Sequence, residues 1–142
     1  MNLHNALRLL NNMKELDWNL YPNFSKSEFD CKHTGKNEMK HSFMDRLQAL
    51  RDAYGKPMVV SSGFRDYTHP VEVKKPKKNG AHPTGLAVDI KIARAEAYEL
   101  IGLAIKMGFT GVGINQRGGS RFIHLDTIES SPLQPRPTIW SY

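Results

Sequence analysis

The sequence predicts an α+β fold in which helices flank a small antiparallel sheet. Apolar and other side chains alternate along residues 86–92 and again along 121–126, which is the period of a half-buried strand. Along 38–54 and 93–107 the apolar residues instead recur every three or four positions, as on one face of a helix. Helices therefore precede and interrupt the strands, an order typical of α+β proteins.

The first half of the chain is expected to be mainly helical. A stripe of leucines predicts a helix over 3–13. Ser25 and Glu28 have the spacing of a capping box, which predicts the start of a short helix. The longest expected helix covers 38–54 and ends at Gly55, a residue suited to the left-handed turn that stops helices.

The second half is expected to supply the sheet. A short strand at 58–61 is followed by a long loop over 66–81, and loops of that length are often functional lids or disordered segments. Strands at 109–115 and 121–126 are joined by five residues and predict a hairpin. The tail, 130–142, contains three prolines and no periodicity, and its aromatic residues Trp140 and Tyr142 are expected to pin it to the body.

Length and composition predict one domain over 1–142, with its core at about 22–128. No apolar run reaches the roughly 18 residues that a membrane-spanning helix needs, so we expect no membrane insertion. The first residues lack the features of a signal peptide, which predicts a protein made in the cytoplasm. The single Cys31 excludes an internal disulfide, and a monomer is expected.

The net charge of +6 and pI near 9.5 raise the question of an anionic partner. The densest basic run, 74–78, lies in a loop rich in proline and glycine and has no interleaved aromatic residues for base stacking. We therefore expect a solvated loop and no nucleic-acid partner, with attraction to an anionic bacterial wall as the functional alternative. A basic nucleic-acid-binding domain remains a third hypothesis, and salt-sensitive DNA binding would identify it.

Three residues are candidate metal ligands: His82, Asp89 and His124. Asp89 lies on the strand face opposite the aliphatic residues, and His82 precedes that strand by a turn at Gly85. If the strand at 121–126 lies beside it, His124 faces Asp89. A buried carboxylate needs a partner, and two imidazoles with a cation supply one. Three protein ligands and an open fourth position are typical of catalytic zinc.

The His-x-x-Gly-x-Ala-x-Asp pattern of residues 82–89, followed by His124, resembles the superfamily of zinc D-Ala-D-Ala carboxypeptidases and peptidoglycan L,D-peptidases. The similarity extends to residues 24–31, to Ser-Ser-Gly-Phe-Arg at 61–65, and to 122–126. It covers about residues 22–128 and is closest to the small carboxypeptidase-like and phage endolysin branches.

This resemblance implies a Hedgehog/DD-peptidase-like fold, one Zn²⁺ per chain and hydrolysis of an amide bond in peptidoglycan stem peptides or cross-links. It also implies a phage enzyme released through a holin, or a component of the virion, that acts on the cell wall. Arg65 matches an arginine that binds a substrate carboxylate or the developing oxyanion. His69 matches a position beside the site and is a candidate to hydrogen-bond the substrate.

The sequence departs from the family at the general base. Many members have an acidic residue three positions before the last ligand, where this chain has Arg121. Asp126 is the candidate replacement, because it shares a strand face with His124. It could act as the base or could orient His124, and Glu129 is a weaker substitute. A catalytically degenerate member that keeps zinc and binds wall peptide or a partner protein is therefore the alternative function.

Overall fold

The computed structural model describes residues 1–13 and 15–142, with the side chains of residues 11–13 left aside. The described strands form a five-stranded sheet of order β1-β2-β4-β3-β5. The strands are β1 (Val59–Ser62), β2 (Ala87–Lys91), β3 (Gly111–Asn115), β4 (Phe122–Asp126) and β5 (Thr138–Ser141). The α-helices are α1 (Leu3–Met13), α2 (Lys26–Phe29), α3 (His41–Tyr54), α4 (Pro70–Val73) and α5 (Arg94–Lys106), and the 3-10 helices are η1 (Trp18–Leu20) and η2 (His82–Thr84).

The α+β class predicted from the sequence is confirmed, but the sheet is mixed rather than wholly antiparallel. The pairs β1–β2, β2–β4 and β3–β4 are antiparallel, whereas β5 runs parallel to β3. Strand β5 was not predicted from the sequence, because most of its side chains are exposed and therefore show no apolar alternation. Its pairing depends on backbone hydrogen bonds to β3 rather than on buried side chains.

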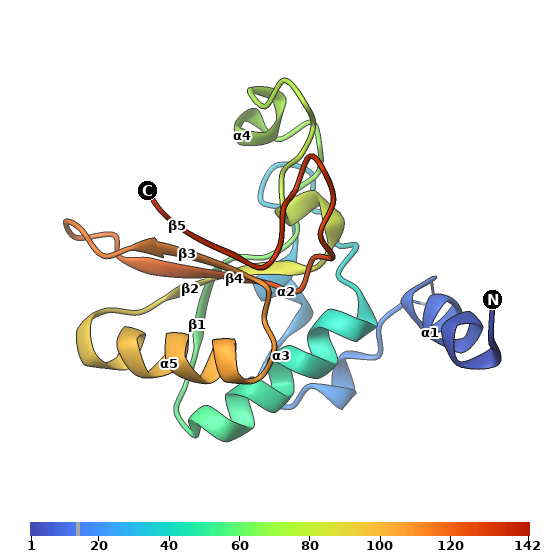
Figure 1. Cartoon of the computed structure of the whole chain (residues 1–142), viewed down its shortest axis with the longest axis horizontal. Helices are drawn as coiled ribbons and strands as arrows, with labels where there is room; N and C mark the ends of the chain where they lie inside the picture. Colours follow the sequence, from blue (N-terminus) through green and yellow to red (C-terminus); the bar gives the residue numbers. More distant parts are fainter. Residues whose placement is uncertain (14) are drawn as a thin grey trace.

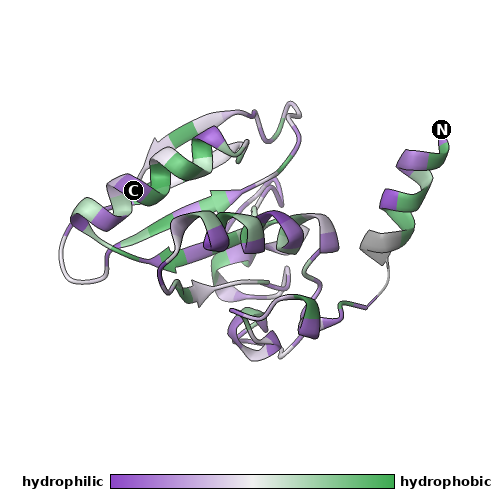
Figure 2. Cartoon of the chain, turned by 90° about the horizontal axis from the view of Figure 1, so that it is seen from below, coloured by the Kyte–Doolittle hydropathy of each residue, from purple (hydrophilic) through white to green (hydrophobic). Residues whose placement is uncertain are grey.

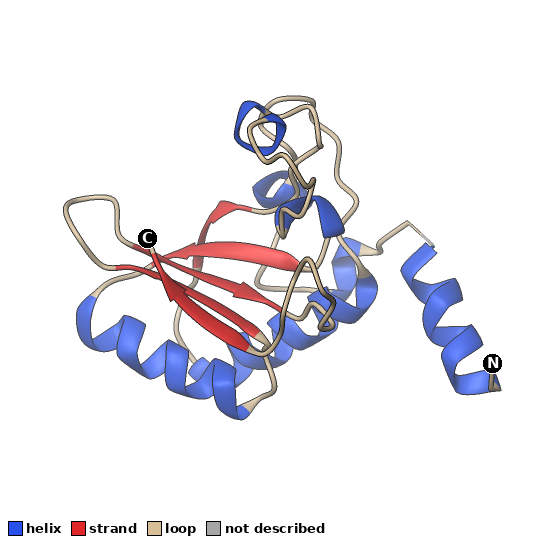
Figure 3. Cartoon of the chain, turned by 45° about the horizontal axis from the view of Figure 1, so that its top comes forward, coloured by secondary structure: helices blue, strands red, loops and turns tan. Residues whose placement is uncertain are grey.

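One face of the sheet is covered by α3 and α5, which lie side by side beneath it (Figure 1, Figure 3). Strand residues on this face are fully buried and alternate along β2 and β4 as predicted: Val88, Ile90, Ile123 and Leu125. Helix residues that bury against the same core are Phe43, Leu47, Leu50 and Leu100. Gly55 ends α3 in the left-handed conformation, with φ of 74°.

The opposite face of the sheet is polar. Asp89 of β2 lies directly opposite His124 of β4, and Asp126 follows on the same face. On β3 the positions opposite His124 and Asp126 are Gly113 and Gly111. A Cβ atom at Gly111 would lie 2.4 Å or less from three carboxyl atoms of Asp126. Glycine at this position therefore leaves the space that the carboxylate occupies.

Helix α1 stands apart from the sheet and contacts α3 (Figure 2). Its leucine stripe, predicted from the sequence, is largely exposed: Leu3, Leu7 and Leu10. Arg8 of this helix approaches Glu129, with 3.7 Å between the guanidinium and the carboxylate. Across the described ranges, no helix combines the length and apolar character that crossing a bilayer requires.

Candidate metal centre

The two central strands bring Asp89 and His124 together. Because these residues are register partners on neighbouring strands, their side chains leave the sheet side by side on one face. Nδ1 of His124 lies 3.0 Å from Oδ1 of Asp89. Both side chains are buried, at 2% and 8% exposed. The pairing of these two strands, on which the predicted site depended, is confirmed.

The third candidate ligand, His82, reaches the same place from the 3-10 helix η2. Its Nδ1 lies 2.7 Å from the carbonyl oxygen of Gly63. A carbonyl can only accept a hydrogen bond, so Nδ1 carries the proton and Nε2 is left for a metal. The turn after η2 requires Gly85, which has φ of 73° and whose added Cβ would lie 2.1 Å from the Glu38 carbonyl oxygen.

The three side chains fit a tetrahedral metal. Their candidate ligand atoms all lie within 4.8 Å of one another. Oδ1 of Asp89 is 3.3 Å from Nε2 of His82 and 3.0 Å from Nδ1 of His124. Zinc–ligand bonds of roughly 2.0–2.2 Å place neighbouring ligand atoms of a tetrahedron about 3.4 Å apart. The cluster therefore has the composition to hold one zinc ion, and the two separations that involve Asp89 are close to the tetrahedral value.

The protonation preferences of two ligands suit this role. Burial lowers the pKa of His82, which favours the neutral imidazole that binds metals. Burial by itself would raise the pKa of Asp89, but the close approach of the His124 and His82 imidazoles outweighs it and holds that pKa below its usual range. Asp89 is therefore an ionised carboxylate between two imidazoles, as a cation site requires.

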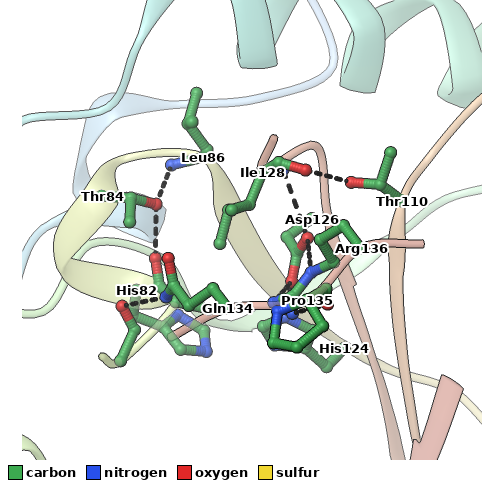
Figure 4. Close-up of polar contacts among 12 residues, drawn as sticks. His82, Thr84, Leu86, Thr110, His124, Asp126, Ile128, Gln134, Pro135 and Arg136 are labelled. Carbon is green, nitrogen blue, oxygen red and sulfur yellow. Dashed lines mark hydrogen bonds and ion pairs between the residues drawn. The ribbon is translucent and has the colours of Figure 1, made fainter. Parts of the chain in front are cut away.

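Asp126 lies at the opposite edge of the His124 ring from Asp89. Its Oδ2 is 2.8 Å from Nε2 of His124, and the guanidinium of Arg136 binds both of its oxygens at 3.0 and 2.8 Å (Figure 4). The backbone N–H of Ile128 donates a further bond to Oδ1. Burial opposes ionisation of Asp126, yet the bonds from His124 and Arg136 keep its pKa below the ordinary value.

Arg65 lies on the cavity side of the cluster. It follows the strand β1 and the buried Phe64, and one of its terminal nitrogens lies 3.5 Å from Oδ2 of Asp89. Its other terminal nitrogen is 3.2 Å from Oε2 of Glu72, whose side chain is 1% exposed. Glu72 belongs to the short helix α4 within the predicted long loop, and Lys75 also contacts its carboxylate.

The remaining candidates lie farther from the ligands. Nδ1 of His69 accepts a hydrogen bond from the Val71 backbone and so caps α4. The centroids of the His69 and His33 rings are 5.9 Å apart, in an edge-to-face arrangement. His69 is not among the residues that line the cavity above the ligands. Glu129 is directed to solvent and to α1, with its side chain 87% exposed. Cys31 is buried and accepts a hydrogen bond from the backbone N–H of Asp66.

A cavity of about 580 Å³ opens over the three ligands. Its lining combines cations, aromatic rings and amides, and includes Arg65, Lys75, Asn79, Phe122, Gln134, Arg136, Trp140 and Tyr142. Gln134 donates hydrogen bonds to the carbonyls of Asn79 and Gly80, which joins the C-terminal segment to the loop that carries α4. These hydrogen bonds connect the two segments that line the cavity, the loop before η2 and the C-terminal segment.

Comparison with known proteins agrees with this arrangement. The family model of peptidase M15 matches residues 22–126, which is most of the chain, and the protein therefore belongs to the peptidase M15 family. A search of curated proteins found no match. Family membership and the His82, Asp89 and His124 cluster together support a zinc peptidase that acts on a peptide substrate.

Two residues beside the ligands were missed by sequence reasoning. Glu72 lies in a basic, proline-containing loop, where a carboxylate has no periodic pattern to mark it as buried. Arg136 lies in the tail, beyond the matched range. A weak signal existed in β3, where Gly111 and Gly113 alternate with apolar residues and so mark a strand face that needs space.

Proposed function

We propose that the protein is a zinc-dependent peptidase that hydrolyses an amide bond in peptidoglycan stem peptides or cross-links, as a phage endolysin or virion-associated lysin. The observation that carries the proposal is the convergence of two histidines and one aspartate, from η2, β2 and β4, beneath a cavity with an arginine at its edge. A three-ligand site with an open side is the composition of catalytic rather than structural zinc.

One zinc ion per chain would be held by Nε2 of His82, Oδ1 of Asp89 and Nδ1 of His124. Zinc at such a site supplies a Lewis acid and activates water near neutral pH. Addition of water to the amide breaks the carbon–nitrogen bond and leaves a carboxylate and an amine. The protein's own groups must bind the peptide, stabilise the charge that develops on the carbonyl oxygen and move one proton to the leaving amine.

Arg65 is the group proposed to meet developing or fixed negative charge on the substrate. Its side chain is 18% exposed and lines the cavity, while Glu72 anchors one of its nitrogens. A guanidinium fixed in this way offers donors to a substrate carboxylate or oxyanion without reorganising. His69, whose Nδ1 caps α4, would contact the substrate through Nε2 only from the outer edge of the site.

For Asp126 we propose the orienting role rather than that of general base. Both of its oxygens are bound by Arg136, one also receives the His124 N–H, and the side chain is 0% exposed. A carboxylate on a ligating imidazole fixes the tautomer and raises the basicity of the ligand. A base would instead have to reach the open side of the cluster, where Asp126 does not lie.

The charge of the protein suits an anionic wall as the substrate surface. The chain carries a net charge of +6, and three of the four lysines in the 74–78 run are exposed, on the same loop as the cavity residue Asn79: Lys74, Lys77 and Lys78. Cations near the mouth of a site raise the local concentration of an anionic polymer. Lys75, the fourth, lines the cavity itself.

The alternative is a degenerate member that keeps zinc and binds wall peptide or a partner protein without cleaving it. One observation favours it: among the described residues that line the cavity, the only side-chain carboxylate is that of the candidate ligand Asp89. Arg121 occupies the place where the resemblance would lead one to expect an acid. A proton acceptor other than a cavity carboxylate is therefore required if the protein is an enzyme.

The test is digestion of purified peptidoglycan and of isolated muropeptides, read by mass spectrometry. Zinc-loaded protein should yield fragments with one new amine and one new carboxylate, and the mass difference identifies the bond. EDTA-treated protein and the Asp89→Asn variant should yield none, whereas Arg117→Ala, a change on an exposed turn, should behave as the wild type. Intact muropeptides that nevertheless bind to the zinc-loaded protein would favour the degenerate member.

A further inference from the structure

The C-terminal segment is built into the metal centre although it lies outside the range that the family model matches. That range ends at residue 126, yet seven residues of 133–142 line the cavity above the ligands: Leu133, Gln134, Pro135, Arg136, Thr138, Trp140 and Tyr142. One of these, Arg136, forms a hydrogen bond to Asp126, which in turn forms a hydrogen bond to the candidate ligand His124 (Figure 4). The segment is therefore connected to the candidate metal site through Asp126 and His124.

The contact between Arg136 and Asp126 is close, bidentate and buried. Nε lies 3.0 Å from Oδ1 and the terminal nitrogen Nη2 lies 2.8 Å from Oδ2, with side-chain exposures of 9% and 0%. Two parallel bonds from a planar guanidinium fix the plane of a carboxylate as well as its position. Nη1 of Arg136 is held in turn by the carbonyl oxygen of Pro135 at 2.9 Å.

The fixed carboxylate holds the ligand. Oδ2 of Asp126, one of the two oxygens that Arg136 binds, accepts a hydrogen bond from Nε2–H of His124 at 2.8 Å. That bond turns Nδ1 of the ring toward Asp89. Removal of the guanidinium would leave a buried carboxylate without its cation and without two of the four contacts that define its orientation. The orientation of His124 would then be less well defined.

The same segment also contacts the face of the His124 ring. The indole of Trp140 lies 5.0 Å from the imidazole, centroid to centroid, and the Arg136 guanidinium lies 5.3 Å from the centroid of Trp140. Trp140 is placed by the parallel pairing of β5 with β3, where it lies opposite Gly113. A Cβ at Gly113 would come within 2.7 Å of the indole, so glycine permits the approach.

We propose that Arg136 is a positioning residue for the metal ligand His124, acting through Asp126, so that the C-terminal segment sets the affinity of the site for zinc. The inference rests on the proposed zinc site but not on any substrate. Arg136 need not contact the metal or the peptide in order to act. Its effect is on the orientation of the ligand before the metal binds.

The experiment measures zinc affinity of the full-length apo-protein by competition with a chromophoric chelator at one pH, without substrate. Arg136→Ala should weaken zinc binding by about 10–100-fold, the range typical of groups that orient metal ligands. The zinc affinity of Arg136→Lys should lie between those of the wild type and Arg136→Ala, because an ammonium keeps the charge but cannot bind both oxygens in one plane. Arg117→Ala removes an exposed arginine and should leave the affinity unchanged.

Chemical rescue separates positioning from general damage to the fold. Guanidinium ion at millimolar concentration should restore zinc affinity to Arg136→Ala but should have no effect on Asp126→Ala, which lacks the group that guanidinium would bind. If Arg136→Ala does not fold, the test uses Arg136→Lys instead. Its zinc affinity is measured, and NMR determines the tautomer of its His124. A wild-type zinc affinity in Arg136→Ala, or in a folded Arg136→Lys with an altered tautomer, overturns the inference.

A wild-type protein that binds no zinc overturns this inference and the proposed function together, whereas a zinc-binding protein without peptidase activity overturns only the proposed function.

Discussion

Two arginine–carboxylate pairs flank the metal cluster, and they differ in what they leave available. Arg136 and Asp126 form a closed pair behind His124, with exposures of 9% and 0% and with both carboxylate oxygens bound. Arg65 and Glu72 form an open pair at the edge of the cavity, where Arg65 is 18% exposed and also approaches Asp89. The first pair contacts the candidate ligand His124 through Asp126, whereas the second approaches Asp89 through Arg65 and also offers a cation that a substrate can reach.

This difference separates two jobs that similar chemistry could do. A carboxylate that is fully bound and buried can orient a ligand but has no lone pair directed at a substrate. An arginine with one anchored nitrogen keeps further donors for an incoming anion. We therefore expect changes in the closed pair to act on metal affinity, and changes in the open pair to act on turnover.

The largest effect should come from the ligands between the pairs. His82→Ala and His124→Ala each remove one of three protein ligands, and zinc affinity should fall by more than the roughly 100-fold expected of any neighbouring residue. Elemental analysis after dialysis should find less than stoichiometric zinc in both variants. Circular dichroism serves as the control for folding, and one tightly held zinc in either variant would contradict the assignment of that ligand.

The closed pair should give the next largest effect. Asp126→Ala leaves Arg136 buried without its anion, which should lower the free energy of unfolding by about 3–5 kcal/mol in urea titrations. Zinc affinity should fall by about 10–100-fold, because His124 loses the bond that orients it. If zinc affinity and stability were retained while turnover was lost, Asp126 would be the base, and the contrast between the two pairs would fail.

The open pair should act on chemistry alone. Arg65→Lys should lower kcat/KM for peptide hydrolysis by about 10²–10³-fold, the range typical of losing one donor to an oxyanion, while zinc affinity changes little. Glu72→Gln removes the charge that anchors Arg65 and should have a smaller effect, about tenfold, since a bond to a charged group is worth about 1.5–3 kcal/mol and the amide keeps part of it. Loss of zinc in either variant would show that the open pair also controls zinc affinity, and would contradict the distinction between the two pairs.

The smallest effect should come from the space beside the closed pair. Gly111→Ala would place a Cβ 2.2 Å from Oδ2 of Asp126, and overpacking of this kind should destabilise the fold by about 1–3 kcal/mol. The matched control is Gly102→Ala on α5, where no atom beyond the chain neighbours and the local helix backbone lies within 4 Å of the new Cβ. That change should stabilise the protein by about 0.5–1 kcal/mol through helix propensity. Thermal unfolding of both variants against the wild type checks the difference.

Periodicity and local chemistry carried much of the fold. The alternation in 86–92 and 121–126 predicted β2 and β4 and the face that each ligand shares, because a strand directs its side chains by a fixed period of two. The three- and four-residue spacing of apolar positions predicted α3 and α5 in the same way. Prediction of α3 began three residues early, since helix ends depend on capping contacts rather than on periodicity.

The sequence by itself determined the proposed ligand set, because residue type and, for Asp89 and His124, the strand face are local properties. Only the tertiary structure decided the contacts around it: that Asp126 is bound by Arg136, that Arg65 is anchored by Glu72, and that the proline-containing tail adds a strand parallel to β3. These are contacts between segments without a shared pattern, formed where chain packing brings them together. The energy of a buried charge depends on such neighbours, and no local pattern in the chain encodes them.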